Sequence, residues 1–348
     1  MSIDHVAESI NDKLRKDEKV KVRVALFGQP GAGKSSLINK IIGRKVAQVG
    51  VETDKTVAAA AYEHNGIILV DLPGYGTKNF PKEGYFEKFG IEEFDLFLCV
   101  SSGKLHGADS EFFRALLNRG KTCIFVVNKH DELWEENVSL QELELRKIKD
   151  IHQHCGSEVD VLFTSCRQNT GIGALNEAIR QNLDAAKKER WTRGAKAYTH
   201  EFLRQKRKAC ERYVSYAAAA SAANGINPVP GVDVAVDLGI LTKLFSEIRT
   251  DFGLDDDFLA TLKQSSLPAV SRVANNLLQF ATKEGLLLLL KRFAGAEAVK
   301  TLSKYIPFVG QALAAGVGYA ITSNAGNSYL QDCYSLAESA LDNKLGVR

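Results

Sequence analysis

The 348-residue sequence lacks an apolar stretch long enough to cross a membrane. A spanning helix needs about 20 predominantly apolar residues, and the longest apolar runs contain Asp233 and Asp237 or are interrupted by Pro307 and Gln311. The N-terminus, MSIDHVAESI, has neither the apolar segment of a secretory signal nor a glycine at position 2 for myristoylation. We therefore expect a cytoplasmic protein whose contact with membranes is at most peripheral.

Paired cysteine spacing is also missing. The six cysteines are scattered, and several lie inside apolar runs, which favours free thiols in a reducing compartment over a disulfide framework. One of them ends the run His152-Gln-His154-Cys155, but no second cluster of metal ligands accompanies it in the sequence. We expect no metal site at this run.

A large excess of one charge is missing from the chain as a whole, whose net charge is +3, but one segment is strongly basic. Between Lys187 and Arg212, ten Lys or Arg residues stand against three Glu. A solvated helix face explains such a segment, and contact with an anionic membrane or another polyanion is the alternative. Because no RNA-binding signature accompanies it, we expect no nucleic-acid partner, although a ribosome- or RNA-associated role stays open.

The length and the pattern of the chain predict two domains, because single cores stop growing at roughly 250 to 300 residues. Up to residue 184, short β-rich runs alternate with helical segments. This alternation predicts a doubly wound α/β domain with a parallel sheet over residues 19–184. The expected strands are residues 20–27, 57–62, 67–71, 95–100, 122–128 and 159–164.

After residue 184 the strand signals end, and Ala, Leu and Lys dominate, which predicts an all-helical domain over residues 185–348. Two similar segments, Pro228-Val-Pro-Gly231 and Pro307-Phe-Val-Gly310, are expected to start packed helices of its core, with peripheral membrane contact as the alternative. Residues 1–18 are expected to form an amphipathic helix that packs on this domain and makes it discontinuous. Its apolar stripe consists of Ile3, Val6, Ala7, Ile10 and Leu14.

Local signals refine this picture. Ser139 and Glu142 have the spacing of a capping box and Gly156 is a helix-ending glycine, so a helix is expected between them. Trp134 and Trp191 are interpreted as packing residues.

The segment from Gly28 to Ser35 reads GQPGAGKS, follows an apolar strand and opens a helix, which is the context that a phosphate loop requires. Its backbone N–H groups and the start of the helix are expected to surround the β-phosphate of a nucleotide. Lys34 is expected to bridge the β- and γ-phosphates, and Ser35 to bind Mg²⁺. The nucleotide-contacting residues predicted here are Gly28, Gly31, Ala32, Gly33, Lys34, Ser35 and Ser36.

Asp71-Leu-Pro-Gly74 ends the next long strand. Asp71 is expected to reach Mg²⁺ through water, and the Gly74 N–H to contact the γ-phosphate. The switch loop before this segment needs a threonine whose hydroxyl and carbonyl contact Mg²⁺ and the γ-phosphate. Thr53 and Thr56 are the candidates, and we favour Thr56. The predicted metal ligands are therefore Ser35, Thr56 and Asp71, and the residues expected to carry hydrolysis are Lys34, Ser35, Thr56 and Gly74.

Asn128-Lys-His-Asp131 ends another strand and predicts guanine as the base. The Asp131 carboxylate accepts two hydrogen bonds from N1–H and the 2-amino group of guanine, and adenine offers neither donor there. Asn128 is expected to hold the phosphate loop and the Lys129 stem to cover the base. In Thr164-Ser165-Cys166, the backbone of Ser165 and Cys166 can donate to guanine O6. GTP or GDP with Mg²⁺ is therefore the expected ligand.

The phosphate loop, the Asp71 segment and a third segment at residues 94–101 carry a family resemblance. GQPGAGKSSLIN at residues 28–39, DLPGYGTKNFP at 71–81 and FDLFLCVS at 94–101 resemble the immunity-related GTPases of the dynamin superfamily. NPVPGVDVAVD at 227–237 and YIPFVG at 305–310 look like the helical-domain hairpins of that family, and also like those of bacterial GTPases with a related helical tail.

This resemblance implies nucleotide-dependent dimerisation through the G domain, slow GTP hydrolysis stimulated by self-association, and action at intracellular membranes. Lys34 places the chain with the lysine-bearing members, and Gly31 replaces the Asn of potassium-dependent relatives. Tyr75 stands where Ras-like enzymes carry the glutamine that orients water, so the water must be positioned otherwise. Arg44 could act in cis, although a solvated charge is its more ordinary role.

Taken together, the sequence predicts a GTPase that couples hydrolysis to homodimerisation or oligomerisation on a membrane. Two alternatives stay open: a regulatory switch that binds a protein effector, and a ribosome- or RNA-associated GTPase.

Overall fold

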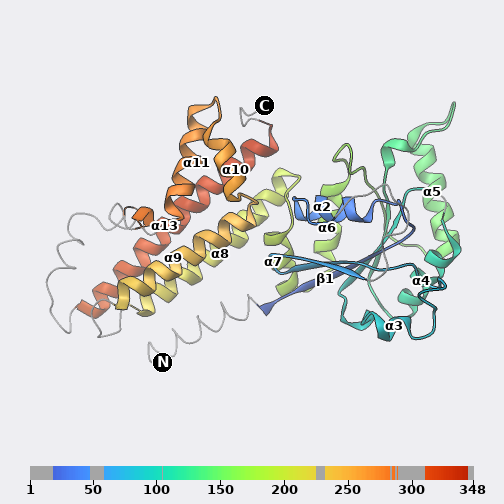
Figure 1. The fold of residues 1–348 in the computed structure, drawn as a ribbon, viewed down its shortest axis with the longest axis horizontal. Helices are drawn as coiled ribbons and strands as arrows, with labels where there is room; N and C mark the ends of the chain where they lie inside the picture. Colours follow the sequence, from blue (N-terminus) through green and yellow to red (C-terminus); the bar gives the residue numbers. More distant parts are fainter. Residues whose placement is uncertain are drawn as a thin grey trace. The chain divides into compact units, whose positions relative to one another are not determined.

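The computed structural model describes residues 19–47, 59–103, 105–224, 232–282, 284–286, 288 and 310–343. Contacts between Cα atoms divide the chain into two compact units. The first, Val20–Lys196, holds the sheet, and the second contains the helices from Ala197 onward (Figure 1).

A six-stranded sheet forms the centre of the first unit. Its strands lie in the order β2-β3-β1-β4-β5-β6, and all neighbours are parallel except β2 and β3, which are antiparallel. All six expected strands are present, and the expected parallel sheet is confirmed except at β2, which runs antiparallel to β3. The strands are β1 (Val22–Phe27), β2 (Ala60–His64), β3 (Ile67–Asp71), β4 (Leu96–Ser101), β5 (Cys123–Val127) and β6 (Val161–Phe163).

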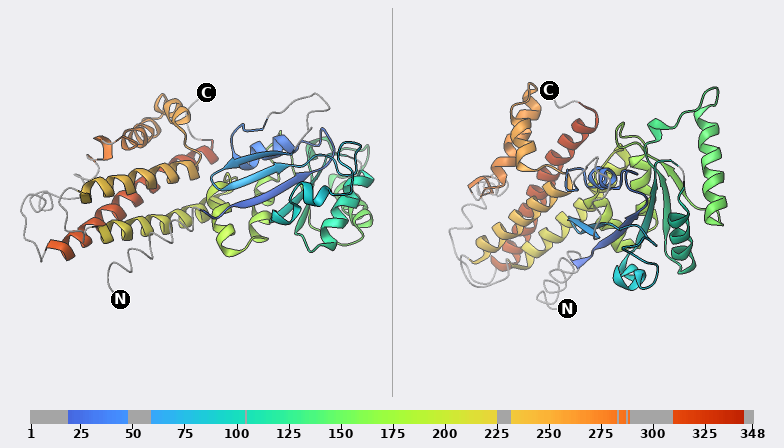
Figure 2. Two further views of the ribbon diagram at one scale, coloured as in Figure 1. Left: turned by 60° about the horizontal axis from the view of Figure 1, so that its bottom comes forward. Right: turned by 45° about the vertical axis from the view of Figure 1, so that its right-hand side comes forward.

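Helices cover both faces of this sheet, as the doubly wound pattern predicts (Figures 1 and 2). Because side chains alternate along a strand, Ala25 and Phe27 of β1 face an aromatic-rich core under α4 and α5, while Val24 and Leu26 are buried on the opposite side. The short helices are α3 (Tyr85–Lys88), η1 (Ile91–Glu93) and η2 (His130–Glu132). The longer ones are α2 (Lys34–Ile42), α4 (Gly107–Asn118), α5 (Leu140–Cys155), α6 (Ile172–Gln181) and α7 (Ala185–Gly194).

The ends of α5 agree with the sequence signals. The Ser139 hydroxyl accepts a hydrogen bond from the Glu142 N–H at 3.3 Å, and Gly156 ends the helix in the left-handed conformation at φ 72°. The capping residues therefore satisfy backbone groups that the helix itself leaves unpaired.

Helix α7 belongs to the sheet unit, which extends to Lys196, twelve residues beyond the predicted boundary at residue 184. Trp191 explains this, since its side chain is fully buried and its Nε1 donates to the Asn176 carbonyl at 3.1 Å. Trp191 is thus a packing residue as interpreted. The same interpretation is wrong for Trp134, which is 79% exposed.

Five helices form the described part of the second unit, and they pack around one apolar core. At its centre the rings of Phe245 and Tyr329 stack with centroids 3.9 Å apart. At another point α8 and α13 are joined by a buried hydrogen bond from the Thr322 hydroxyl to Ser221 Oγ at 2.9 Å. The helices are α8 (His200–Asn224), α9 (Val232–Asp251), α10 (Asp256–Lys263), α11 (Pro268–Phe280) and α13 (Gly310–Leu341).

Some sequence predictions fall outside the described residues: the N-terminal helix over 1–18, Thr53 and Thr56, and most of the two Pro-x-x-Gly segments. Helices α9 and α13 begin at Val232 and Gly310, directly at the ends of those two segments. All six cysteines are free thiols. Within the described residues, no helix combines the length and apolarity that crossing a membrane requires.

Candidate nucleotide-binding site

The GQPGAGKS segment forms a loop between β1 and α2, and two of its glycines are required by close contacts. Gly28 has φ 135°, and a Cβ atom there would lie 2.0 Å from the Val100 carbonyl oxygen. Gly33 has φ 92°, and a Cβ atom there would lie 2.2 Å from Asn128 Nδ2. Side chains are therefore excluded at both positions, and the loop can lie directly against β4 and the Asn128 side chain.

Lys34 begins α2 and its side chain folds back over the loop. Its Nζ donates to the Gly28 carbonyl at 2.8 Å and to the Gln29 carbonyl at 3.3 Å. Asp71, at the end of β3, places Oδ1 3.7 Å from the same Nζ. Two segments that are distant in sequence, the phosphate loop and the end of β3, thus bring a buried ammonium and a buried carboxylate together.

Asp71 is a buried carboxyl group with one oxygen that has no hydrogen-bond partner among the described residues. Burial raises the pKa of its carboxyl, and the charge of Lys34 opposes that rise. Among the described residues, Oδ1 has no hydrogen-bond partner although it is buried. A buried carboxylate oxygen without a hydrogen-bond partner fits a hard cation such as Mg²⁺, which prefers oxygen ligands. When bound, Mg²⁺ neutralises charge on the β- and γ-phosphate oxygens.

The segment after Asp71 is held by aromatic contacts. The Tyr85 hydroxyl donates to the Pro73 carbonyl at 2.5 Å, and Gly74 is exposed. The ring of Tyr75 stacks on Phe112 at 4.7 Å and meets Tyr85 edge-on at 5.1 Å. Tyr75 is therefore a packing residue on the α4 side of the sheet.

Asn128 ties the base end of the site to the phosphate loop. Its Nδ2 donates to the Ala32 carbonyl at 2.9 Å, and its Oδ1 accepts from the Thr164 hydroxyl at 3.1 Å and from Cys166 Sγ at 3.6 Å. Lys129 follows in the left-handed conformation at φ 57°. The amide of Asn128 is thus satisfied on both sides and holds three segments in register.

Asp131 lies beside Ser165, with only 5% of its side chain exposed. A hydrogen bond from the Ser165 side chain lowers the pKa of its carboxyl, and the nearby Arg167 acts in the same direction. The hydrogen bond and the nearby cation therefore favour the charged carboxylate at this end of β5.

Sequence reasoning missed two neighbours of this site. Gln29 Nε2 donates to Asp109 Oδ2 of α4 at 2.8 Å, and the exposed Arg167 places Nη1 3.8 Å from Asp131. No motif marks either residue, because both contacts depend on tertiary structure. Arg44, the candidate cis-acting cation, instead contacts His64 Nδ1 on β2 at 2.6 Å.

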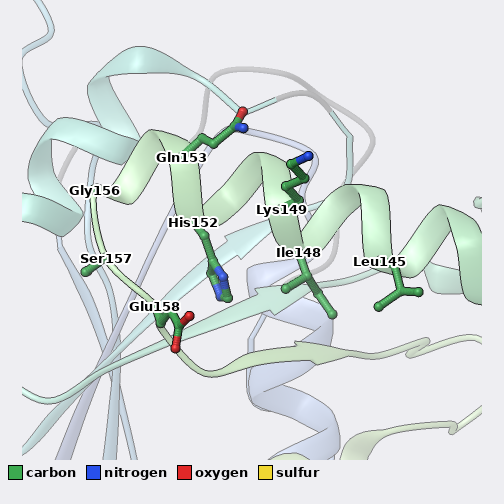
Figure 3. A pocket seen from close by; sticks show the side chains of 8 residues that line it. All are labelled: Leu145, Ile148, Lys149, His152, Gln153, Gly156, Ser157 and Glu158. Carbon is green, nitrogen blue, oxygen red and sulfur yellow. The ribbon is translucent and has the colours of Figure 1, made fainter.

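A cavity of about 500 Å³ lies elsewhere, along α5 and the segment that follows it. Figure 3 shows Leu145, Ile148 and His152 projecting from the same side of the helix, with Glu158 near His152. None of its lining residues belongs to the nucleotide motifs, so this cavity is separate from the candidate site.

A phosphate loop, a buried acidic strand end and a guanine-type Asn-Lys-x-Asp segment on one sheet edge define a P-loop GTPase. The family model of the interferon-inducible GTPases matches residues 2–283, and the chain belongs to that family. Membership makes it an enzyme that binds GTP and hydrolyses it.

Relatives in this family are similar at modest identity. Mouse interferon-gamma-inducible GTPase 10 is 26% identical over 75% of this chain, and the match covers about two thirds (67%) of the mouse protein. Bovine interferon-inducible GTPase 5 is 25% identical over 97% of this chain and 78% of its own length. Among solved structures, Aquifex aeolicus Era bound to GDP·AlF4⁻ is 23% identical with a TM-score of 0.38, covering 47% of this chain and 57% of Era.

Proposed function

We propose that this chain hydrolyses GTP slowly as a monomer and faster when two copies associate through their G domains at a membrane surface. The observation that carries the proposal is the placement of Tyr75, whose ring packs against Phe112 and Tyr85. The position that supplies a water-orienting glutamine in Ras-like enzymes is here used for packing. Efficient turnover then requires help from a partner.

The proposed complex assigns a role to each residue. Lys34 would leave the loop carbonyls for the β- and γ-phosphates, Ser35, Thr56 and Asp71 would hold Mg²⁺, and the Gly74 N–H would contact the γ-phosphate. In hydrolysis, water attacks the γ-phosphorus while the bond to the β–γ bridging oxygen breaks. Asp131 selects guanine, and Ser165 and Cys166 offer their N–H groups to O6.

Self-activation is tested by measuring specific GTPase activity against enzyme concentration. Ras-like enzymes without help turn over at about 10⁻⁴ to 10⁻³ s⁻¹, and we expect this range at low concentration with a rise as sedimentation with a GTP analogue shows dimers. Constant specific activity together with a strictly monomeric analogue-bound protein would contradict the proposal and favour the effector switch.

The membrane part rests on family membership more than on the basic segment. Within residues 187–212, the side chains of Arg190, Arg193 and Lys206 are buried, so these three cations cannot face a lipid surface. Co-sedimentation with anionic and neutral liposomes, with and without a GTP analogue, tests membrane binding. Binding to RNA in a parallel assay, without liposome binding, would instead favour the RNA-associated alternative.

A further inference from the structure

Helix α4 carries a buried carboxylate that the nucleotide motifs do not include. Asp109 lies in the first turn of α4 and is 8% exposed. It accepts the hydrogen bond from Gln29 Nε2 at 2.8 Å. Burying a carboxylate is costly unless it is well bonded, so a group placed here for packing alone would be apolar. The bond to Gln29 therefore indicates a role for the charge.

Gln29 is the residue through which this charge reaches the phosphate loop. Its backbone carbonyl accepts from the Ala32 N–H at 3.2 Å and from Lys34 Nζ at 3.3 Å. Fixing the Gln29 side chain thus fixes the carbonyl that closes the turn of the loop.

The helix that provides Asp109 is firmly anchored. One turn further along α4, Phe112 meets the ring of Phe27 edge-on at 4.7 Å and stacks on Tyr75 at the same distance. Phe27 precedes the phosphate loop and Tyr75 follows the Asp71-Leu-Pro-Gly74 segment. An anchored support of this kind preorganises a binding loop.

We propose that Asp109 is a positioning residue, which holds the phosphate loop in its nucleotide-accepting curve through Gln29. This inference rests on the proposed nucleotide site. Since bound GTP, bound GDP and the transition state all need the same curve of the loop, the bond contributes uniform binding, which changes affinity but leaves kcat unaltered.

Exchange of donor and acceptor tests the proposal. Gln29→Glu sets two carboxylates against each other and should weaken GDP and GTP binding about tenfold or more, the effect expected for a hydrogen bond to a charged group. Adding Asp109→Asn provides an amide donor for the new carboxylate at position 29 and keeps the total charge of the pair. The double variant should recover to within about threefold of wild type, with kcat within about twofold throughout.

Gln29→Ala keeps the proposal testable if a charged variant unfolds, because it removes only a half-buried loop side chain. It should also weaken both nucleotides with kcat unchanged. Glu142→Gln on α5, whose side chain is 53% exposed, is the control. Wild-type affinity in Gln29→Ala, or a double variant no better than Gln29→Glu, would overturn the inference. Failure of wild type itself to bind GTP would instead refute the nucleotide site.

Discussion

At the scale of single residues, the site concentrates charges that are costly to bury and useful to a ligand. Lys34 Nζ lies 3.7 Å from Asp71 Oδ1, and both residues are buried. The side chain of Asp131 is also almost fully buried, beside Ser165. Such groups contribute little to folding and much to recognition, because each is oriented before the ligand arrives.

Asp131→Asn should move base preference from guanine to xanthine. The amide cannot accept both guanine donors, whereas xanthosine nucleotides present a carbonyl where guanine has its 2-amino group. Losing a matched buried hydrogen-bonding group costs several kcal/mol, or about 10⁴-fold. Competition binding of GTP and XTP measures the change, with Asp150→Asn on α5 as the control. Unaltered GTP affinity would show that Asp131 does not contact the base.

Lys34→Ala and Ser35→Asn should impair nucleotide and Mg²⁺ binding respectively while the fold persists. Lys34 Nζ bonds only to loop carbonyls among the hydrogen bonds of the described residues, so its loss leaves the sheet core intact. Nucleotide titration and circular dichroism should be recorded on the same samples. Full binding by either variant would refute the assigned phosphate loop.

Asp71→Asn should stabilise the nucleotide-free protein at neutral pH. Burial raises the pKa of Asp71 in the folded state above the unfolded value, which is near 3.9. Between these two values the folded state keeps a proton that the unfolded state loses. The stability of the wild-type protein therefore falls as the pH rises through this window. The variant escapes this loss. Its melting temperature should exceed that of wild type by a few degrees at pH 7, with 1 kcal/mol worth about 2–4 °C.

The same advantage should shrink as the pH falls towards 4. The Asp71 carboxyl is then increasingly protonated in the unfolded state too, so the folded and unfolded states differ less in bound protons. Asp160→Asn, an exposed change just before β6, is the matched control for the substitution itself. An advantage that stays constant from pH 4 to 7 would assign the effect to packing rather than to charge.

At the scale of elements, the strands could be predicted from the sequence, but a contact that depends on how the elements pack could not. The six strands are recognisable as apolar runs, and their ends differ from the expected ones by at most three residues, as in Val22 against the expected start at 20. The antiparallel direction of β2 also has a sequence signal, because Asn65-Gly66 is a typical two-residue hairpin turn. In the structure these two residues have φ 46° and 74°. The Gln29–Asp109 bond had no such signal, because the position of α4 over the loop follows from packing.

The buried hydrogen bond between α8 and α13 offers a test of helix pairing. Thr322→Val should leave the Ser221 hydroxyl without this bond and destabilise the protein by about 1–3 kcal/mol, whereas adding Ser221→Ala should recover much of the loss, since replacing both partners is nearly neutral. Urea unfolding of the two single variants and the double variant measures the coupling. Additive losses would show that the two hydroxyls do not depend on each other.

At the scale of the whole molecule, the family match extends from residue 2 to 283 and so covers the sheet unit and part of the helical unit. The sequence predicted the division into an α/β and a helical part correctly, but not its position. The basic composition of α7 resembles the segment after it, and only the burial of Trp191, Arg190 and Arg193 shows that this helix completes the sheet unit.

The placement of α7 has a practical consequence for separating the two units. A fragment that stops at residue 184 would expose the apolar surface that Trp191 covers and leave the Asn176 carbonyl without its indole donor. Such a fragment should aggregate or melt well below one that stops at 196. Gene fusions and inherited truncations face the same limit: a viable exchange of helical parts between relatives has to retain α7 with its sheet, so recombination breakpoints should be tolerated after Lys196 and selected against within the preceding dozen residues.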